Sequence, residues 1–91
     1  MDFQTEESSI VYKNADGAVL ARVDFSEVTS GVYDIFHTEV DASLQGQGIA
    51  GKLVARAVSE IERRGGKTME DASCSYAAAW LKRHAEKGVS Q

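Results

Sequence analysis

The sequence has no proline, one cysteine and no long apolar segment, and the last two shortages each exclude a class of protein. A membrane-spanning helix needs about 20 consecutive apolar residues, and no run of that length occurs. Cys74, as the only cysteine, can form neither an internal disulfide nor an all-cysteine metal site. His37 and His84 are scattered relative to it, so we expect no bound metal.

Basic side chains are also scarce, with 10 against 14 acidic ones and a net charge of -4. Because affinity for nucleic acid depends on dense positive charge, we expect no nucleic-acid partner. The shortage is concentrated in residues 1–51, which hold 2 basic and 9 acidic side chains, whereas residues 52–91 hold 8 and 5. The second half can therefore accept a small anionic ligand, although uneven surface charge alone has the same pattern.

The remaining composition is that of a globular chain, with 43% hydrophobic and 26% charged residues. A length of 91 residues predicts a single domain, 1–91, in which segments 1–8 and 88–91 are loosely ordered. The acidic first residues are unlike a secretory signal, which is basic and then apolar. We therefore expect a soluble, cytoplasmic protein that does not bind membranes and is a monomer or a weak homodimer.

Three strands are predicted in the first half of the chain, at residues 9–13, 18–25 and 32–40, from alternating apolar residues. Residues 14–17, Asn-Ala-Asp-Gly, are typical of a hairpin loop. In the third strand, side-chain alternation predicts two faces, one with Val32, Phe36, Thr38 and Val40 and the other with Tyr33, Ile35, His37 and Glu39.

Helical spacing of apolar residues begins after Gly48 and predicts a helix that ends at Gly65 and Gly66. Residues 67–72 are a predicted fourth strand. Residues 75–87 are a predicted second helix, stopped by Gly88. Its inner stripe holds Ala77, Leu81 and a core tryptophan, Trp80, with His84 as a further candidate. The order β-β-β-α-β-α predicts an α/β fold with a mixed, largely antiparallel sheet and two packed helices.

A glycine-rich turn, residues 44–53, leads into the first predicted helix. The first N–H groups of a helix lack intrahelical partners, and the dipole adds about half a positive charge there. Three glycines allow close approach of a ligand, and Lys52 and Arg56 add cations on one side of the helix. We favour phosphate binding over a turn that only redirects the chain.

Two nucleotide motifs match this turn in part. Gly46-x-Gly48-x-x-Gly51 fits the dinucleotide fingerprint, but polar residues 41–45 separate it from a strand that looks antiparallel. The spacing from Gly46 to Lys52 fits a Walker A loop, but Leu53 replaces the Ser or Thr that holds magnesium. Both interpretations are therefore disfavoured.

A third pattern, Gln45-Gly46-x-Gly48, resembles the pyrophosphate-binding motif of the GNAT acetyltransferase superfamily. His37-Thr38-Glu39-Val40, Gly46-Gln47-Gly48-Ile49-Ala50, Cys74 and Arg83-His84 follow in the order of small single-domain members, so the resemblance spans about residues 12–87. It implies a truncated GNAT fold that binds acetyl-coenzyme A or coenzyme A (CoA). The implied cofactor-binding residues are Val40, Gln45, Gly46, Gln47, Gly48, Ile49, Ala50, Gly51, Lys52, Arg83 and His84.

Four residues are candidates for acetyl transfer. Cys74 can accept the acetyl group or be a small buried hydrophobe. His37 and Glu39, about 7 Å apart on one strand face, can form a water-relayed general base or an acceptor-amine site, or be structural. Tyr76 can protonate the CoA thiolate or pack on the sheet.

The predicted fourth strand departs from the relatives, in which it is mostly apolar, because it contains Glu70 and Asp71. These acids would suit a cationic amine, or they indicate a partly exposed strand. The sequence favours an acetyl-CoA-dependent N-acetyltransferase that acts on a small-molecule or peptide amine. A CoA-binding module with little or no transferase activity is the alternative, and a nucleotide-binding or structural module is a third possibility.

Overall fold

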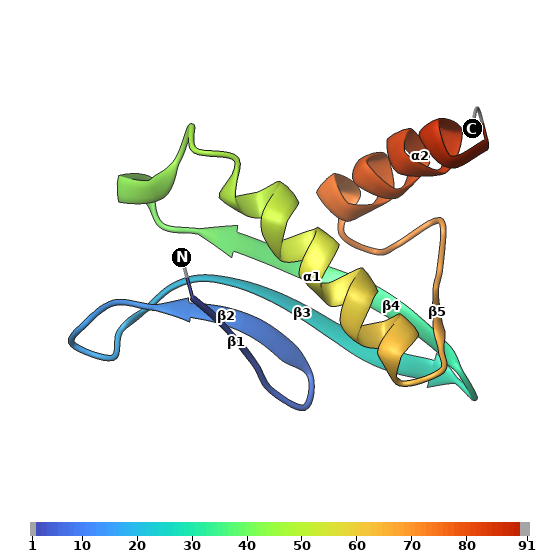
Figure 1. The fold of residues 1–91 in the computed structure, drawn as a ribbon, viewed down its shortest axis with the longest axis horizontal. Coiled ribbons are helices and arrows are strands. Elements are labelled where there is room, and N and C mark those ends of the chain that lie inside the picture. The colour runs from blue at the N-terminus through green and yellow to red at the C-terminus, as the bar shows by residue number, and fades with distance from the viewer. Residues whose placement is uncertain (1, 90–91) are drawn as a thin grey trace.

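A computed structural model describes residues 2–89 as one mixed sheet with two α-helices (Figure 1). The expected loosely ordered residues 1, 90 and 91 lie outside this range. The sheet order is β1-β2-β3-β4-β5, with antiparallel pairs except for the parallel pair β4–β5. The predicted α/β fold is confirmed. The elements are β1 (Phe3–Thr5), β2 (Ser9–Lys13), β3 (Val19–Thr29), β4 (Val32–Val40), a 3-10 helix η1 (Ala42–Leu44), α1 (Ile49–Arg63), β5 (Lys67–Thr68) and α2 (Ser75–Val89).

The strand β1 was not predicted, because it lies in the acidic segment expected to be loosely ordered. It pairs with β2, and the Phe3 ring packs edge-on against Tyr12 with centroids 6.4 Å apart. The Arg56 guanidinium lies 5.5 Å from the centroid of the same ring. One aromatic side chain thus attaches a polar segment to the sheet. At the other end, α2 continues past Gly88, where we expected it to stop.

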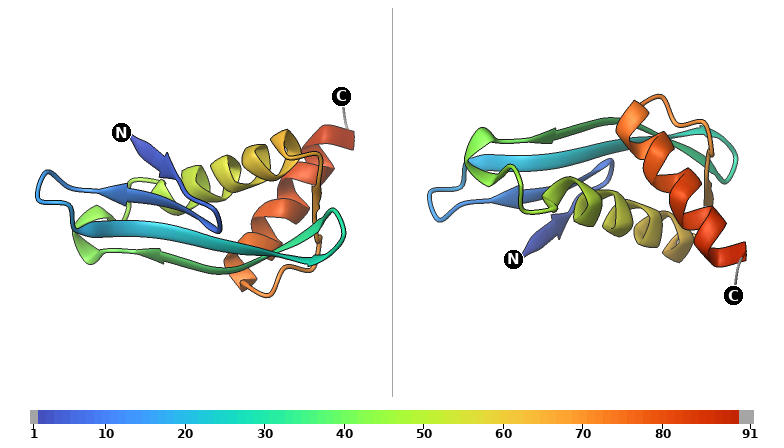
Figure 2. Two further views of the ribbon diagram at one scale, coloured as in Figure 1. Left: turned by 90° about the horizontal axis from the view of Figure 1, so that it is seen from below. Right: turned by 90° about the horizontal axis from the view of Figure 1, so that it is seen from above.

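The hydrophobic core lies between the sheet and α1, which runs along one sheet face (Figure 2). Sheet residues such as Ile10, Val23 and Ile35 are completely buried, as are Leu53 and Ile61 on the inner face of α1. The predicted helical stripe is therefore the face that packs on the sheet. The second helix crosses beside β4 and contributes the completely buried Ala77 (Figure 1).

A β-bulge in β4 overturns the predicted division of its side chains between two faces. Asp24 pairs with His37 and Phe25 with Ile35, so Phe36 is an extra residue in β4. The bulge shifts the alternation, and Ile35 and Thr38 therefore share the core face. This corrects one part of the prediction, since Ile35 and Tyr33 do not share a face with His37 and Glu39. The other part is confirmed, since His37 and Glu39 do share a face with each other.

The fourth strand is shorter than predicted, with two residues in place of 67–72. After Thr68 the chain leaves the sheet, and the Asp34 carboxylate accepts hydrogen bonds from the Ser73 N–H (2.8 Å) and hydroxyl (2.6 Å). Glu70 and Asp71 are exposed in this segment, where their charges keep their hydration. Within residues 2–89, β5 pairs only with the start of β4, so the β4 edge from residue 36 to 40 has no neighbouring strand.

Two glycines end α1, and the second, Gly66, has the least room for a side chain among the described glycines. Gly65 has a φ of 83°, and the Gly66 N–H donates to the Ile61 carbonyl at 3.0 Å, as in a Schellman motif. A Cβ on Gly66 would lie 2.7 Å from the Tyr33 ring and 3.0 Å from the Gly31 carbonyl oxygen.

We expect Gly66→Ala to lower the free energy of unfolding by about 2 kcal/mol, because backbone must move to admit the methyl group. Urea denaturation measures this loss. Gly51→Ala is the control, since its nearest neighbour is the movable Tyr76 hydroxyl at 3.3 Å. Equal losses in the two variants would contradict this packing.

Glu60 makes the strongest ion-pair cluster of α1. Its side chain is 10% exposed and accepts hydrogen bonds from Arg63 (2.6 Å) and Arg64 (2.7 Å). These bonds, first that from Arg63, lower the pKa of Glu60 from 4.5 to about 2. Arg64 also donates to the Glu7 carbonyl at 2.8 Å, which ties the β1–β2 turn to α1.

A carboxylate whose pKa falls on folding stabilises the protein above its unfolded value, and this contribution disappears as pH falls through the folded value. Glu60→Gln is therefore expected to be less stable than the wild type at pH 7. The difference should shrink between pH 4.5 and about 2. Urea unfolding over this range measures it, and a difference independent of pH would contradict the role of the charge.

Candidate functional site

The open edge of β4 leads directly to the glycine-rich turn. After Val40, the short helix η1 is capped by Asp41, whose carboxylate accepts from the Ser43 hydroxyl (2.6 Å) and N–H (3.0 Å). These two bonds lower the pKa of Asp41. The chain then passes through Gln45 to the start of α1, so the sheet edge and the helix N-terminus are neighbours (Figure 1).

Two glycines shape the turn through their backbone conformation. Gly46 and Gly48 have φ values of 83° and 73°, in the left-handed region that favours glycine. Gly48 is the N-cap of α1 and provides no capping side chain, and the first turn contains no acidic residue. The first N–H groups of α1 and the positive end of its dipole are therefore available to an anion.

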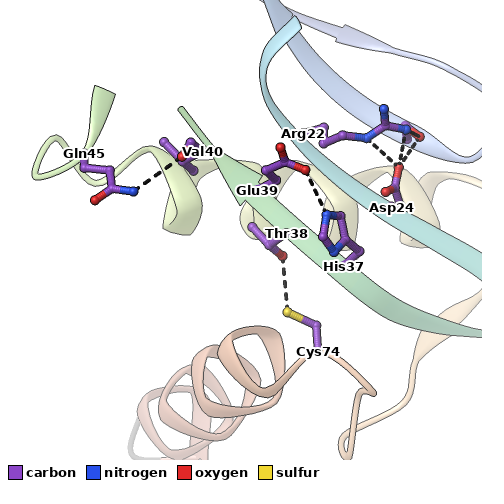
Figure 3. Close-up of polar contacts among 9 residues, drawn as sticks. Arg22, Asp24, His37, Thr38, Glu39, Val40, Gln45 and Cys74 are labelled. Atoms are coloured by element: carbon purple, nitrogen blue, oxygen red, sulfur yellow. Dashed lines mark hydrogen bonds and ion pairs between the residues drawn. The ribbon is translucent and has the colours of Figure 1, made fainter. Parts of the chain in front are cut away.

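A hollow of about 290 Å³ lies between the sheet edge and this helix start. The Gln45 side chain borders one side of the hollow, with its Nε2 3.5 Å from the Val40 carbonyl oxygen (Figure 3). All but one of the lining residues are predicted cofactor-binding residues, and Leu44 is the addition. The lining residues are Val40, Leu44, Gln45, Gly46, Gly48, Ile49 and Ala50.

Three other predicted cofactor residues do not line this hollow. Gly51 faces α2, where a Cβ would lie 3.3 Å from the Tyr76 hydroxyl and 3.7 Å from the Trp80 indole nitrogen. Its small size therefore allows the two helices to approach. Gln47 and Lys52 are exposed beside the turn.

Arg83 and His84 are exposed on α2 and also lie outside the lining of the hollow. The His84 ring stacks on Trp80, with centroids 3.6 Å apart and planes 13° apart. Its Nδ1 lies 2.9 Å from the Trp80 carbonyl oxygen. Trp80, predicted to belong to the core, is only partly buried and connects His84 to the neighbourhood of Gly51.

Cys74 lies at the open edge of β4, on the face of the strand that carries Thr38 (Figure 3). Its N–H donates to the Ile35 carbonyl at 3.0 Å, and its own carbonyl accepts from the Ala78 N–H in the first turn of α2 at 2.9 Å. The thiol is half-buried and forms no disulfide, and its sulfur is 3.4 Å from the Thr38 hydroxyl oxygen.

His37 and Glu39 lie on the opposite face of β4 and contact each other directly. The His37 Nε2 is 3.1 Å from a Glu39 carboxylate oxygen. Both side chains are largely exposed, at 49% and 68%. The neighbouring strand presents the Arg22–Asp24 ion pair (2.8 Å) on this face (Figure 3).

The catalytic candidates thus form two groups, one on each face of β4. Cys74 is on the core face with Tyr76 two residues further along α2, whereas His37 and Glu39 are on the other face. Thr38 was missed as a functional candidate. Its place between His37 and Glu39 was visible in the sequence, but its contact with a residue 36 positions away was not.

Neither a metal-binding cluster nor a membrane-spanning helix is expected from the sequence. Among the side chains that the structure describes, no group of three or more from His, Cys, Asp or Glu is arranged to hold a metal ion. None of the described helices is long and apolar enough to cross a bilayer.

The fold and site define a small α/β domain in which an uncapped helix N-terminus adjoins an open sheet edge. The model of the GCN5-related N-acetyl-transferase family matches residues 9–89, and the chain belongs to this family. No curated protein matches the chain.

Solved structures share the fold. A Staphylococcus aureus protein assigned as a GCN5-like N-acetyltransferase is 26% identical, with a TM-score of 0.72 over 93% of this chain and 81% of its own. An assigned GNAT-family acetyltransferase from Desulfovibrio desulfuricans is 22% identical, with a TM-score of 0.56 over 64% of this chain and 38% of its own. The Escherichia coli GNAT-family N-acetyltransferase YhbS, solved with CoA, is 24% identical, with a TM-score of 0.58 over 64% of this chain and 35% of its own. The last two share the fold alone, and the chain spans little more than a third of their length.

Proposed function

We propose that this chain binds CoA and acetyl-CoA in the hollow between β4 and α1. The observation that carries the proposal is the meeting of two complementary surfaces at one hollow: the uncapped start of α1 and the open edge of β4. Family membership and the CoA bound to YhbS, which shares this fold, support the same assignment.

The residues of the hollow suit the two chemical parts of CoA. Phosphates are anions, and the start of α1 presents unpaired N–H groups near Lys52 without an acidic side chain in the first turn. The pantetheine arm contains amides that can pair with a strand edge. The Asp41 N–H donates to the Leu20 carbonyl on β3. Because the backbone groups of successive strand residues point to opposite sides, the N–H and carbonyl of Val40 point toward the open edge.

The proposed reaction is acetyl transfer to an amine by way of Cys74. Acetyl-CoA supplies an activated acetyl thioester. The Cys74 thiolate attacks the thioester carbonyl carbon, a new sulfur–carbon bond forms, and the bond to the CoA sulfur breaks with its electron pair. Tyr76, two residues further along α2 and 40% exposed, is the proposed donor of a proton to the departing thiolate.

His37 and Glu39 are the proposed acceptor-side pair. A carboxylate on the His37 Nε2 favours the tautomer in which that nitrogen carries the proton, which leaves Nδ1 free to accept one. An amine that approaches the open edge from this face can release a proton to His37 and attack the carbonyl carbon of the acetyl group on Cys74. A nitrogen–carbon bond forms, and the sulfur–carbon bond breaks with its electron pair on sulfur, which restores the Cys74 thiolate. The exposed position of the pair suits an amine from solution.

A second candidate function is CoA binding with little or no transfer. The placement of Cys74 and His37 on opposite faces of β4 favours it, because few described residues remain to enclose an acceptor. The two proposed functions differ only in whether the bound acetyl-CoA transfers its acetyl group.

Incubation of the protein with acetyl-CoA and a panel of small amines and peptides tests the proposal. We expect release of CoA thiol, detected with a disulfide reagent after removal of the protein, together with an acetylated amine detected by mass spectrometry. Calorimetric binding of CoA without turnover would support the binding module. Absence of both would contradict the assignment.

A further inference from the structure

The contact between Thr38 and Cys74 is the one side-chain hydrogen bond that the structure records for the Cys74 thiol. The backbone of Cys74 is fixed at both ends, by the Ile35 carbonyl on β4 and by the first turn of α2. Rotation about the Cα–Cβ bond is therefore the remaining freedom of the sulfur. The Thr38 hydroxyl, 3.4 Å away, selects the rotamer that points to the β4 edge (Figure 3).

A threonine hydroxyl can serve both forms of the thiol. It accepts from S–H when Cys74 is protonated and donates its own proton when the sulfur is a thiolate. The half-buried position of Thr38 limits competition from water for this bond.

We propose that Thr38 is a positioning residue for Cys74: its hydroxyl directs the sulfur toward the open edge of β4 and donates a hydrogen bond to the thiolate. The catalytic consequence rests on the proposed function, since acetyl transfer through Cys74 needs this form at this edge. The contact itself can be tested without acetyl-CoA.

Alkylation by iodoacetamide measures the reactivity of Cys74 directly, because the chain has no other cysteine. Thr38→Val removes the hydroxyl at nearly constant shape, Thr38→Ser retains it, and Thr38→Ala removes it without the branched side chain. At one pH we expect the alkylation rate to fall about tenfold in Thr38→Val and Thr38→Ala and to stay within about twofold of wild type in Thr38→Ser.

Circular dichroism of each variant confirms folding, and alkylation in urea, where the contact is absent, should give equal rates for all. An unchanged or faster rate in the folded Thr38→Val and Thr38→Ala variants would overturn the proposal. In that case the hydroxyl only accepts from the protonated thiol.

Turnover is the second measurement. Where the wild type transfers acetyl groups, we expect Thr38→Val to lower kcat with an unchanged KM for acetyl-CoA, and Thr38→Ser to restore it. A loss of alkylation rate in a protein without turnover would contradict the proposed transferase function and leave the positioning role intact. Normal turnover together with a normal alkylation rate in Thr38→Val would overturn the positioning role alone.

Discussion

Gly48→Glu is expected to abolish binding of CoA while the domain remains folded. A Cβ at this position would meet no atom within 4 Å, so the main cost to folding is the strain of a φ of 73°, about 1 kcal/mol. Its carboxylate would occupy the positive start of α1 and repel phosphate. We expect the Kd for CoA in isothermal titration calorimetry to rise by about 100-fold or more.

Gly17→Glu is the matched control for this variant. Gly17 has a φ of 85°, and a Cβ there also meets nothing within 4 Å, but it lies in the turn between β2 and β3. The strain and the added charge are therefore alike, and only the location differs. Gly17→Glu should lose similar thermal stability and keep its CoA affinity. A folded Gly48→Glu variant that binds CoA normally would refute the proposed phosphate position.

Cys74→Ala should abolish acetyl transfer and leave CoA binding unchanged. Alanine cannot accept the acetyl group, and the backbone bonds that hold position 74 to Ile35 and Ala78 do not involve the side chain. Loss of a nucleophile lowers kcat by a factor on the order of 10³ or more. Turnover assays and calorimetry on the same preparation separate the two effects.

Intact-mass spectrometry supplies a further test of this route. The wild type mixed with acetyl-CoA and no amine should carry one acetyl group, whereas Cys74→Ala should carry none. Tyr76→Phe, which lacks the proposed proton donor to the CoA thiolate, should acquire the acetyl group more slowly than the wild type. Undiminished turnover in Cys74→Ala would eliminate the acetyl-cysteine route and leave direct attack of the amine on acetyl-CoA.

Local patterns in the sequence predicted the parts of the fold that local interactions determine. The helical stripe from Ile49 to Ile61 faces the core as its spacing required. Asn14 accepts hydrogen bonds from the backbone of Asp16 and Ala18 within the predicted hairpin loop. The glycine turn adopts the left-handed conformations that its composition favours.

Contacts between distant segments account for what the sequence did not predict. The bulge at Phe36 depends on the register between β3 and β4, and no pattern within β4 signals it. After the short β5, the chain is held to β4 by the bonds between Asp34 and Ser73, which are 39 positions apart. The Thr38–Cys74 contact is of the same kind.

Gly51 illustrates how one pattern can have two causes. Its spacing from Gly46 and Gly48 predicts a ligand contact, and its lack of a side chain also allows α2 to approach α1 through Tyr76 and Trp80. Likewise, the spacing of His37 and Glu39 placed them correctly on one face, although the identity of the other residues on that face required the register of the sheet.

Backbone NMR titration of the domain with acetyl-CoA tests the central claim most directly, because it reports affinity and position together. Separate samples receive ATP or NAD, which share phosphate chemistry but lack the pantetheine arm. We predict selective shifts at Val40, at residues 45–52 and at Cys74 with acetyl-CoA. No response to acetyl-CoA, or an equal response to all three ligands, would contradict a CoA site between β4 and α1.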